Sequence, residues 1–296
     1  MKDIIVIIGP TGVGKTKLSI SLAKMMNAEI INGDSVSIYK GLDIGSAKPT
    51  IEEREGIVHH LIDVCPVTEN YSVYDYQKDV RRLIEDINKR GKRIIIVGGT
   101  GLYIKAALYD YKFTEGTINN NYDDYSKNEL INKINSYGVR VDDVSNRRRL
   151  VRLLNKLENN EEITNNKDVL LYPSKFIGLT TDRTYLYERI NERVDKMMES
   201  GLLDEILGLK QYYLNSRVLN SAIGYKEFYD YLFGDTSIDD VIERIKLDSR
   251  RFAKRQYTFF NHQFNTTWFD VNFDDFGKTV EEVYTFISNG NEWKML

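Results

Sequence analysis

The chain contains little cysteine, histidine or proline, and it has no long hydrophobic run. Of its 296 residues, one is cysteine, three are histidine and four are proline. The single cysteine, Cys65, excludes a disulfide framework and a cysteine-rich zinc site, and it is typical of a reducing compartment, so we expect a cytoplasmic protein. The apolar stretches are too short for a signal peptide or a membrane span, so we expect no membrane partner.

The most informative motif lies at the start of the chain, where an apolar strand over residues 4–8 runs into a glycine-rich loop. The loop has the G-x-x-x-x-G-K-T pattern of a phosphate loop and continues into an amphipathic helix. Its glycines let backbone N–H groups turn toward a phosphate, its lysine adds positive charge, and its last threonine can ligate Mg²⁺. The alternative, a chance glycine-rich turn, is disfavoured by the flanking strand and helix. The residues predicted to bind a diphosphate are Gly9, Pro10, Thr11, Gly12, Val13, Gly14, Lys15 and Thr16.

Further elements indicate an α/β fold. Residues 29–32 and 93–97 are predicted strands, and residues 74–89 have the apolar spacing of the crossover helix that a parallel sheet requires. Polar residues follow both strands, and open parallel sheets bind ligands at the carboxyl ends of their strands. We therefore predict a P-loop NTPase-like core with a parallel sheet.

The composition divides the chain into three segments. Residues 1–113 form the first part of the predicted core. Residues 114–175 contain asparagine pairs between polar helical segments, and we predict a helical insertion there. Residues 176–296 are predicted to return to the core and to continue as C-terminal helices over 185–198, 203–213 and 238–260.

Two polar residues at predicted strand ends are candidates for catalysis. Asp34 follows the second strand, where a carboxylate facing the loop could act as a general base or as a Mg²⁺ partner. Thr100 follows the third strand and could donate a hydrogen bond to a leaving-group oxygen. The alternatives are structural, because Asp34 could cap the next helix or turn and Thr100 could satisfy the backbone of a tight turn. The third strand ends without the acidic residue of phosphate-loop ATPases, which weakens an ATPase interpretation.

Two basic clusters contrast with the formal net charge of -3. One lies in residues 146–152, on a predicted helix of the insertion, and the other in residues 250–256, on the long C-terminal helix. Each holds four basic residues within seven positions, so contact with phosphates and an ordinary solvated face are both possible interpretations.

Taken in order, these motifs resemble those of the tRNA dimethylallyltransferases, and the resemblance runs nearly from end to end. Several of the motifs are weak individually, but their order and spacing together are specific. After the phosphate loop, the motifs that carry the resemblance are Asp34-Ser35 through Tyr39, Asp43 to Pro49, His59 to Asp63, Tyr71-Ser72, Gly98 to Tyr103, Gly178-Leu179 with Asp182-Arg183, Ile223 to Glu227, and Arg250 through Gln256.

The resemblance implies transfer of a dimethylallyl group from dimethylallyl diphosphate to the N6 amine of the adenosine at tRNA position 37, next to the anticodon. It implies that the phosphate loop and Arg250 hold the diphosphate of this donor in place of ATP, and that Lys15 helps to neutralise the leaving group. Asp34 would accept the amine proton, and Thr100 would hydrogen-bond the bridging oxygen. Mg²⁺ bound at Thr16 is the expected cofactor.

The resemblance also implies contacts with the tRNA anticodon stem-loop, made by a protein that we expect to be a monomer. At Ser37 the chain departs from the family, which usually has glutamine at this position, associated with recognition of the target adenosine. The implied tRNA-binding residues are Asp34, Ser35, Val36 and Ser37 near the reaction centre, Arg148, Arg149 and Arg152 in the insertion, and Lys254 and Arg255 near the C-terminus.

Three other functions stay open at this point. An adenylate isopentenyltransferase would use Asp34 and the phosphate loop on AMP or ADP, and a small-molecule kinase or NTPase would place ATP in the loop. A non-enzymatic tRNA-binding protein would leave Lys15, Thr16 and Asp34 without an explanation. The insertion with its arginines favours tRNA as the acceptor.

Overall fold

A computed structural model describes residues 2–113, 122–141, 146–159 and 169–289 of the chain. The chain divides into two compact units, and each is described by itself. The core unit is formed by Met1–Tyr109 and Leu170–Leu296, and the insertion unit by Asp110–Val169. In the described parts of both units, no helix combines the length and the apolar character needed to cross a bilayer.

The core unit is built on a six-stranded parallel sheet with the order β3-β2-β4-β1-β5-β6. The predicted α/β class with a parallel sheet is therefore confirmed. β1 lies between β4 and β5, so the phosphate loop that follows β1 leaves from the middle of the sheet. The strands are β1 (Ile4–Ile8), β2 (Ala28–Asn32), β3 (His59–His60), β4 (Arg93–Val97), β5 (Ser174–Thr180) and β6 (Thr266–Asp270).

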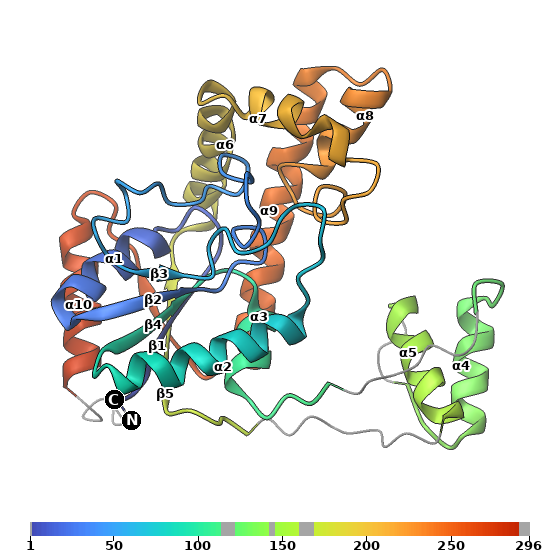
Figure 1. The fold of residues 1–296 in the computed structure, drawn as a ribbon, viewed down its shortest axis with the longest axis horizontal. Helices are drawn as coiled ribbons and strands as arrows, with labels where there is room; N and C mark the ends of the chain where they lie inside the picture. Colours follow the sequence, from blue (N-terminus) through green and yellow to red (C-terminus); the bar gives the residue numbers. More distant parts are fainter. Residues whose placement is uncertain (1, 114–121, 142–145, 160–168, 290–296) are drawn as a thin grey trace. The chain divides into compact units, whose positions relative to one another are not determined.

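Helices cover both faces of this sheet (Figure 1). The side chains of β1 alternate between the two faces and are fully buried, as expected for a central parallel strand. Ile4, Val6 and Ile8 belong to the apolar cluster of one face, and Ile5 and Ile7 to that of the other. The first face is covered by α2 (Val73–Lys89) and α3 (Gly101–Leu108), and the second by α1 (Lys15–Met26) and α10 (Phe276–Ser288).

Most of the remaining helices of the core unit follow β5. α6 begins directly after the carboxyl end of β5, where the Asp182 carboxylate accepts hydrogen bonds from two backbone N–H groups of the first turn. α9 packs alongside α6, which Figure 1 shows as two long neighbouring helices. This group consists of α6 (Arg183–Glu199), α7 (Leu202–Leu209), η1 (Lys210–Tyr212), η2 (Lys226–Phe228), α8 (Tyr229–Phe233) and α9 (Ile238–Gln263).

The C-terminal segment also contains elements that the helical prediction missed. β6 (Thr266–Asp270) pairs with β5 as a parallel edge strand, and α10 follows it. β6 is short and only partly buried, so its residues give a weak strand signal in the sequence. Pairing depends on Gly178 in β5, because a Cβ at this position would collide with the Trp268 ring.

The insertion unit contains α4 (Lys127–Ser136) and α5 (Arg147–Glu158). Polar caps start both helices, because Ser126 accepts a hydrogen bond from the Glu129 N–H and Asn146 accepts one from the Arg149 N–H. The two helices enclose a small apolar core of their own, made of Tyr122, Leu130, Ile134, Leu150 and Leu154.

The bounds of the insertion unit differ from those predicted. The unit ends at Val169, whereas the prediction extended it to residue 175. Leu170 instead pairs with Tyr109 in an isolated β-bridge, and Ser174 already begins β5. Composition marks the polar region but contains no information on these long-range pairings. The predicted residues 114–121, 142–145 and 160–168 lie outside the described parts.

Candidate active site

The phosphate loop, residues 9–16, connects β1 to α1. Gly9 has a φ of 146°, and a Cβ there would lie 2.7 Å from the carbonyl oxygen of Leu179. Gly14 precedes α1 with a φ of 98°, and no side chain caps this helix. Glycine is therefore required at both positions, and the N-terminus of α1 can offer its backbone N–H groups to an anion.

Lys15 contributes the positive charge of the loop. Its ammonium donates a hydrogen bond to the Pro10 carbonyl at 2.8 Å. Burial lowers the pKa of Lys15 to about 8, while the negative charge of Asp34 opposes this shift and the positive charge of Arg193 adds to it. Lys15 thus lies within electrostatic reach of one carboxylate and one other cation.

No motif in the sequence singles out Arg193, which lies on α6. Burial lowers the pKa of its guanidinium and the charges of Asp34 and Glu53 oppose this, although an arginine stays protonated at neutral pH. Within the described residues, Arg193 has neither a hydrogen bond nor an ion pair. Both Lys15 and Arg193 are half-buried, and cations that are withdrawn from water are normally paired, so together they indicate a site for an anionic ligand.

α6 also contacts the outer side of the phosphate loop. Arg189 donates from Nε to the Gly12 carbonyl at 3.3 Å, and its guanidinium lies 4.0 Å from the ring centre of Phe273. Arg250, predicted to bind the diphosphate, donates from α9 to Oδ1 of Asn191 on α6 at 2.5 Å. The structure therefore places Arg250 against the helix that carries Arg193, and among the described residues no hydrogen bond joins it to the loop.

Gln256 links the phosphate loop to the end of β4. Its Oε1 accepts a hydrogen bond from the Thr11 N–H at 3.0 Å, and its Nε2 donates to the Gly99 carbonyl at 3.1 Å. The side chain is buried, and Gly99 must lack a Cβ because one would collide with the Gln256 amide. In the sequence, Gln256 is only the last residue of a basic motif, so its bridging role depends on tertiary contacts.

Asp34 lies two residues after the end of β2. Its Oδ1 accepts a hydrogen bond from the Gly99 N–H at 2.7 Å. Asn32 holds the Asp34 peptide from both sides, because its Oδ1 accepts from the Asp34 N–H at 3.0 Å and its Nδ2 donates to the Asp34 carbonyl at 2.9 Å. No helix begins at Asp34, so helix capping does not explain this residue. The half-buried carboxylate lies at the carboxyl ends of the parallel strands, where the phosphate loop also lies.

Thr100 joins the end of β4 to the loop after β2. Its Oγ1 accepts a hydrogen bond from the Ser35 N–H at 3.0 Å and donates one to Ser35 Oγ at 3.2 Å. The hydroxyl has one proton, so a bond from Thr100 to a leaving-group oxygen requires the bond to Ser35 Oγ to be exchanged. The catalytic role of Thr100 stays a prediction.

The loop after β2 carries the other residues implied in adenosine contact. Ser35 and Val36 are half-buried, and Val36 packs against the apolar cluster of the core unit. Ser37 is 5% exposed, and its carbonyl accepts the Asp63 N–H at 3.3 Å. Ser37 thus contributes to the packing of the loop in this structure.

The basic cluster of the insertion unit divides into structural and exposed members. The Arg147 guanidinium donates hydrogen bonds to backbone carbonyls, including those of Tyr122 and Tyr125, so it ties α5 to the preceding segment. Arg149 and Arg152 are exposed. The side chain of Arg148 lies outside what the structure describes. Phosphate contact therefore stays a prediction for Arg149 and Arg152.

The C-terminal basic cluster lies on α9. Lys254 and Arg255 are exposed, and the Arg255 guanidinium lies 5.7 Å from the ring centre of Phe252. Arg251 forms an ion pair with Asp248 at 3.5 Å. The predicted tRNA-binding residues of this cluster are thus on the surface, whereas Gln256, which ends the same motif, points into the site.

The donor groups for a metal are few. In the described residues, no group of three or more histidine, cysteine, aspartate or glutamate side chains could hold a metal ion. Thr16 is exposed in the first turn of α1 and offers one hard oxygen donor. This arrangement fits a Mg²⁺ ion that takes most of its ligands from a bound diphosphate and water.

Comparison with known proteins shows relatives over nearly the whole chain. A family model described as IPP transferase matches residues 37–263. The tRNA dimethylallyltransferase of Bacillus pumilus is 42% identical over 97% of this chain and 96% of the relative. That of Bacillus subtilis is 44% identical over 97% of both chains. Because these relatives cover 97% of this chain, they extend the match to the N-terminal side of residue 37, where the phosphate loop lies.

Solved structures with the same fold lead to the same family. The full-length tRNA isopentenylpyrophosphate transferase of Bacillus halodurans is 39% identical, with a TM-score of 0.76 over 98% of this chain and 96% of the other. A eukaryotic dimethylallyltransferase acting on tRNA is 29% identical, with a TM-score of 0.80 over 98% of this chain and 80% of the other. The resemblance inferred from the sequence motifs is confirmed, and the chain belongs to the IPP transferase family.

Proposed function

We propose that this chain transfers the dimethylallyl group of dimethylallyl diphosphate to the N6 amine of adenosine 37 in tRNA. The observation that carries this proposal is the anion site formed by Lys15, Arg193 and the N-terminus of α1, with the Asp34 carboxylate close by. This site suits a diphosphate next to a general base. The names of the relatives support tRNA as the acceptor.

In the proposed reaction, the donor diphosphate lies in the phosphate loop. As the allylic C–O bond breaks, its electron pair leaves with the diphosphate. Lys15, Arg193 and the backbone N–H groups of α1 stabilise the negative charge that grows on this leaving group. Mg²⁺ bound with Thr16 would supply further neutralisation of the same charge.

The acceptor amine forms the new bond to the allylic carbon. An adenine amine is a weak nucleophile, so correct orientation must contribute much of the rate enhancement. Asp34 takes the proton that the amine loses, and the hydrogen bond from Gly99 to its Oδ1 orients the carboxylate for this transfer. Asp34 therefore acts as the general base of the acceptor side.

The tRNA would be held by exposed cations and by the shape of its anticodon loop. Arg149 and Arg152 in the insertion unit and Lys254 and Arg255 on α9 are exposed and suited to phosphate contact. The target adenine must leave the stack of the loop to reach the edge of the sheet, which favours recognition of loop shape and unpaired bases.

A transfer assay with labelled dimethylallyl diphosphate and Mg²⁺ tests this function. Unmodified tRNA with adenosine at position 37, AMP, and ATP alone are offered in parallel reactions, and a tRNA with guanosine at position 37 serves as the control. We expect label in the adenosine-containing tRNA alone. Label in AMP with none in tRNA would assign an adenylate enzyme, and ATP turnover without any labelled acceptor would assign a kinase or NTPase.

A further inference from the structure

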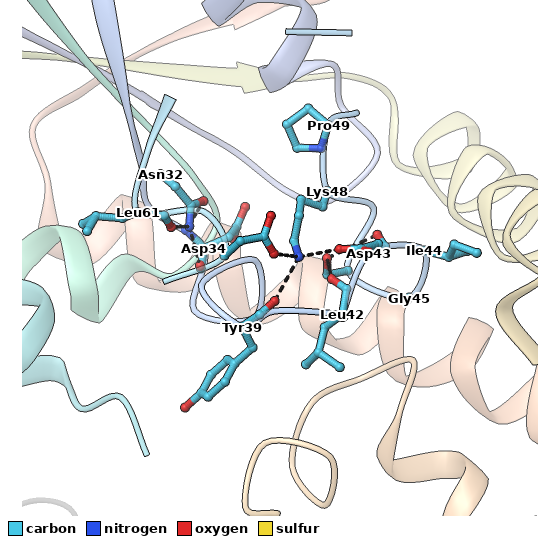
Figure 2. Close-up of polar contacts among 12 residues, drawn as sticks. Asn32, Asp34, Tyr39, Leu42, Asp43, Ile44, Gly45, Lys48, Pro49 and Leu61 are labelled. Atoms are coloured by element: carbon cyan, nitrogen blue, oxygen red, sulfur yellow. Dashed lines mark hydrogen bonds and ion pairs between the residues drawn. The ribbon is translucent and has the colours of Figure 1, made fainter. Parts of the chain in front are cut away.

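Lys48 belongs to a sequence motif, residues 43–49, to which the proposed reaction gives no role. Its side chain is 3% exposed, which is unusual for a lysine. The three N–H donors of its ammonium have three acceptors: Asp43 Oδ1 at 2.6 Å, Asp63 Oδ1 at 2.6 Å and the Tyr39 carbonyl at 2.9 Å. Figure 2 shows the Lys48 ammonium joined by dashed lines to the Tyr39 carbonyl and to the Asp43 carboxylate.

The Lys48 ammonium cross-links the segment of residues 33–63, which contains little regular secondary structure. Ala47, Leu61 and Asp63 all have positive φ, at 47°, 61° and 58°, which is uncommon for residues other than glycine. Strained conformations persist only where surrounding contacts hold them. Lys48 provides such contacts, because it joins the turn at Asp63 to the turn at Asp43.

The segment closed by Lys48 also supports Asp34. The Leu61 carbonyl accepts a hydrogen bond from Asn32 Nδ2 at 2.9 Å, and the same amide group holds the Asp34 carbonyl. The Asp63 N–H donates to the Ser37 carbonyl, three residues beyond Asp34. A change in the position of residues 61–63 would therefore reach the proposed general base through Asn32.

A second anchor holds the outer side of the same loop. The Glu205 carboxylate on α7 accepts hydrogen bonds from the backbone N–H groups of Asp43, Ile44 and Gly45 at 2.7–3.2 Å, and from the Tyr225 hydroxyl at 2.7 Å. The loop is thus fastened to α7 through Glu205, and Lys48 fastens residues 39 and 43 of the loop to Asp63.

We propose that Lys48 is a positioning residue for the acceptor substrate, holding the loop of residues 33–48 so that Asp34 and its neighbours meet the tRNA adenosine. This inference rests on the proposed function. The side chains of elements other than α1 that hydrogen-bond to the phosphate loop in the described residues are Gln256 on α9 and Arg189 on α6. We therefore expect the loss of Lys48 to impair the use of tRNA as the acceptor and to leave the affinity for the donor unchanged.

The test compares Lys48→Met with Lys48→Arg and with Lys246→Met. Lys246 on α9 is a matched control, because it is also a mostly buried lysine that bonds two carboxylates, those of Asp195 and Glu243, but these partners are exposed. Steady-state transfer gives kcat and KM for tRNA, and calorimetric titration with dimethylallyl diphosphate and Mg²⁺, without tRNA, gives the donor affinity. Thermal unfolding shows that each variant is folded.

For Lys48→Met we expect kcat/KM for tRNA to fall about a hundredfold, the scale of a displacement of about 1 Å at a reaction centre. The affinity of Lys48→Met for the donor should equal that of the wild-type protein. Lys48→Arg should recover part of the lost activity because it keeps the positive charge. Lys246→Met should change neither the activity nor the donor affinity. If Lys48→Met does not fold, Asp63→Asn, which weakens one bond of the same ammonium, is expected to give a smaller loss with the same separation.

Equal losses in donor affinity and in tRNA use would overturn the inference, because Lys48 would then support the whole core unit. Unchanged use of tRNA would overturn it as well. If the unchanged protein modifies AMP and not tRNA, the proposed function is wrong, while the separation between donor affinity and acceptor use is still measured with AMP as the acceptor.

Discussion

The core unit and the insertion unit assemble their candidate functional residues in different ways. In the core unit, Asp34, Gly99 and Gln256 are far apart in the sequence and meet through hydrogen bonds at one edge of the sheet. In the insertion unit, Arg149 and Arg152 lie one turn apart on a single helix and are exposed. One site needs the whole fold, whereas the other needs one amphipathic helix.

This difference separates two contributions to function. Half-buried charges at the edge of the sheet interact strongly and directionally, because they are poorly screened by water and salt. Exposed arginines attract phosphates at longer range, and salt weakens this attraction. We therefore expect changes in the core unit to act on the chemical step and on donor binding, and changes in the insertion unit to act on tRNA affinity.

The largest effect is expected for Asp34→Asn. The amide keeps the shape of the side chain but cannot accept the amine proton, so the rate of transfer in a single turnover should fall by about 10²–10⁴-fold. Donor affinity should be spared, and Asp204→Asn on the exposed side of α7 serves as the control. Unimpaired transfer by Asp34→Asn would remove this residue from the base role.

The double variant Arg149→Ala with Arg152→Ala is expected to weaken tRNA binding by about one to two orders of magnitude at 0.1 M salt, through the loss of two phosphate contacts. The slope of log K against log salt should become shallower by about 1.4–1.8. Filter binding over a range of salt concentrations measures both. Arg82→Ala on α2 is the control, since Arg82 is also exposed but pairs with Asp79 in the core unit. An unchanged slope would assign the two arginines to an ordinary solvated face.

A smaller effect is expected from pH. Lys15 has a pKa of about 8 in the free protein, so it loses its proton above this pH, while a bound diphosphate favours the charged form. Donor affinity should therefore fall as pH rises, by about tenfold between pH 7 and pH 9. Calorimetric titration measures this, and Lys15→Arg, which stays charged, should give a flat profile across the window. The same fall in Lys15→Arg would place the titrating group elsewhere.

The smallest effect on chemistry is expected from changes inside the insertion unit. Leu154 is fully buried, and Leu154→Ala should destabilise this unit by about 2–5 kcal/mol. Neighbouring Asn155 is buried with no hydrogen-bond partner for its amide among the described residues, so Asn155→Ala should cost little or stabilise the unit. Hydrogen exchange of the α5 amides in the full chain reports both, and donor affinity should stay unchanged. A fall in donor affinity with Leu154→Ala would show that the two units are coupled.

Much of the site could be predicted because its signals are local. The phosphate loop is contiguous, and its glycines and lysine identify it without any tertiary information. Asp34 and Thr100 could be placed near it because the ends of parallel strands meet at one edge of a sheet. The same rule places Ser35, which follows Asp34, near Thr100, and the Ser35 N–H does donate a hydrogen bond to the Thr100 hydroxyl.

Arg193 and Gln256 could not be predicted in the same way. Each lies on a helix among several other polar residues, and which of these faces the phosphate loop depends on the packing of α6 against α9. β6 was missed because a short edge strand has little alternation of its own, and its pairing depends on space left by Gly178.

The sequence by itself determined the α/β class, the phosphate loop and the family resemblance, because strand and helix periodicity and a contiguous loop are encoded by neighbouring residues. The tertiary structure decided which cations stand beside the loop, which amide bridges it to β4, and how Lys48 closes the segment that supports Asp34. These contacts join residues tens to hundreds of positions apart, and only the packing of helices against the sheet brings them within hydrogen-bonding distance.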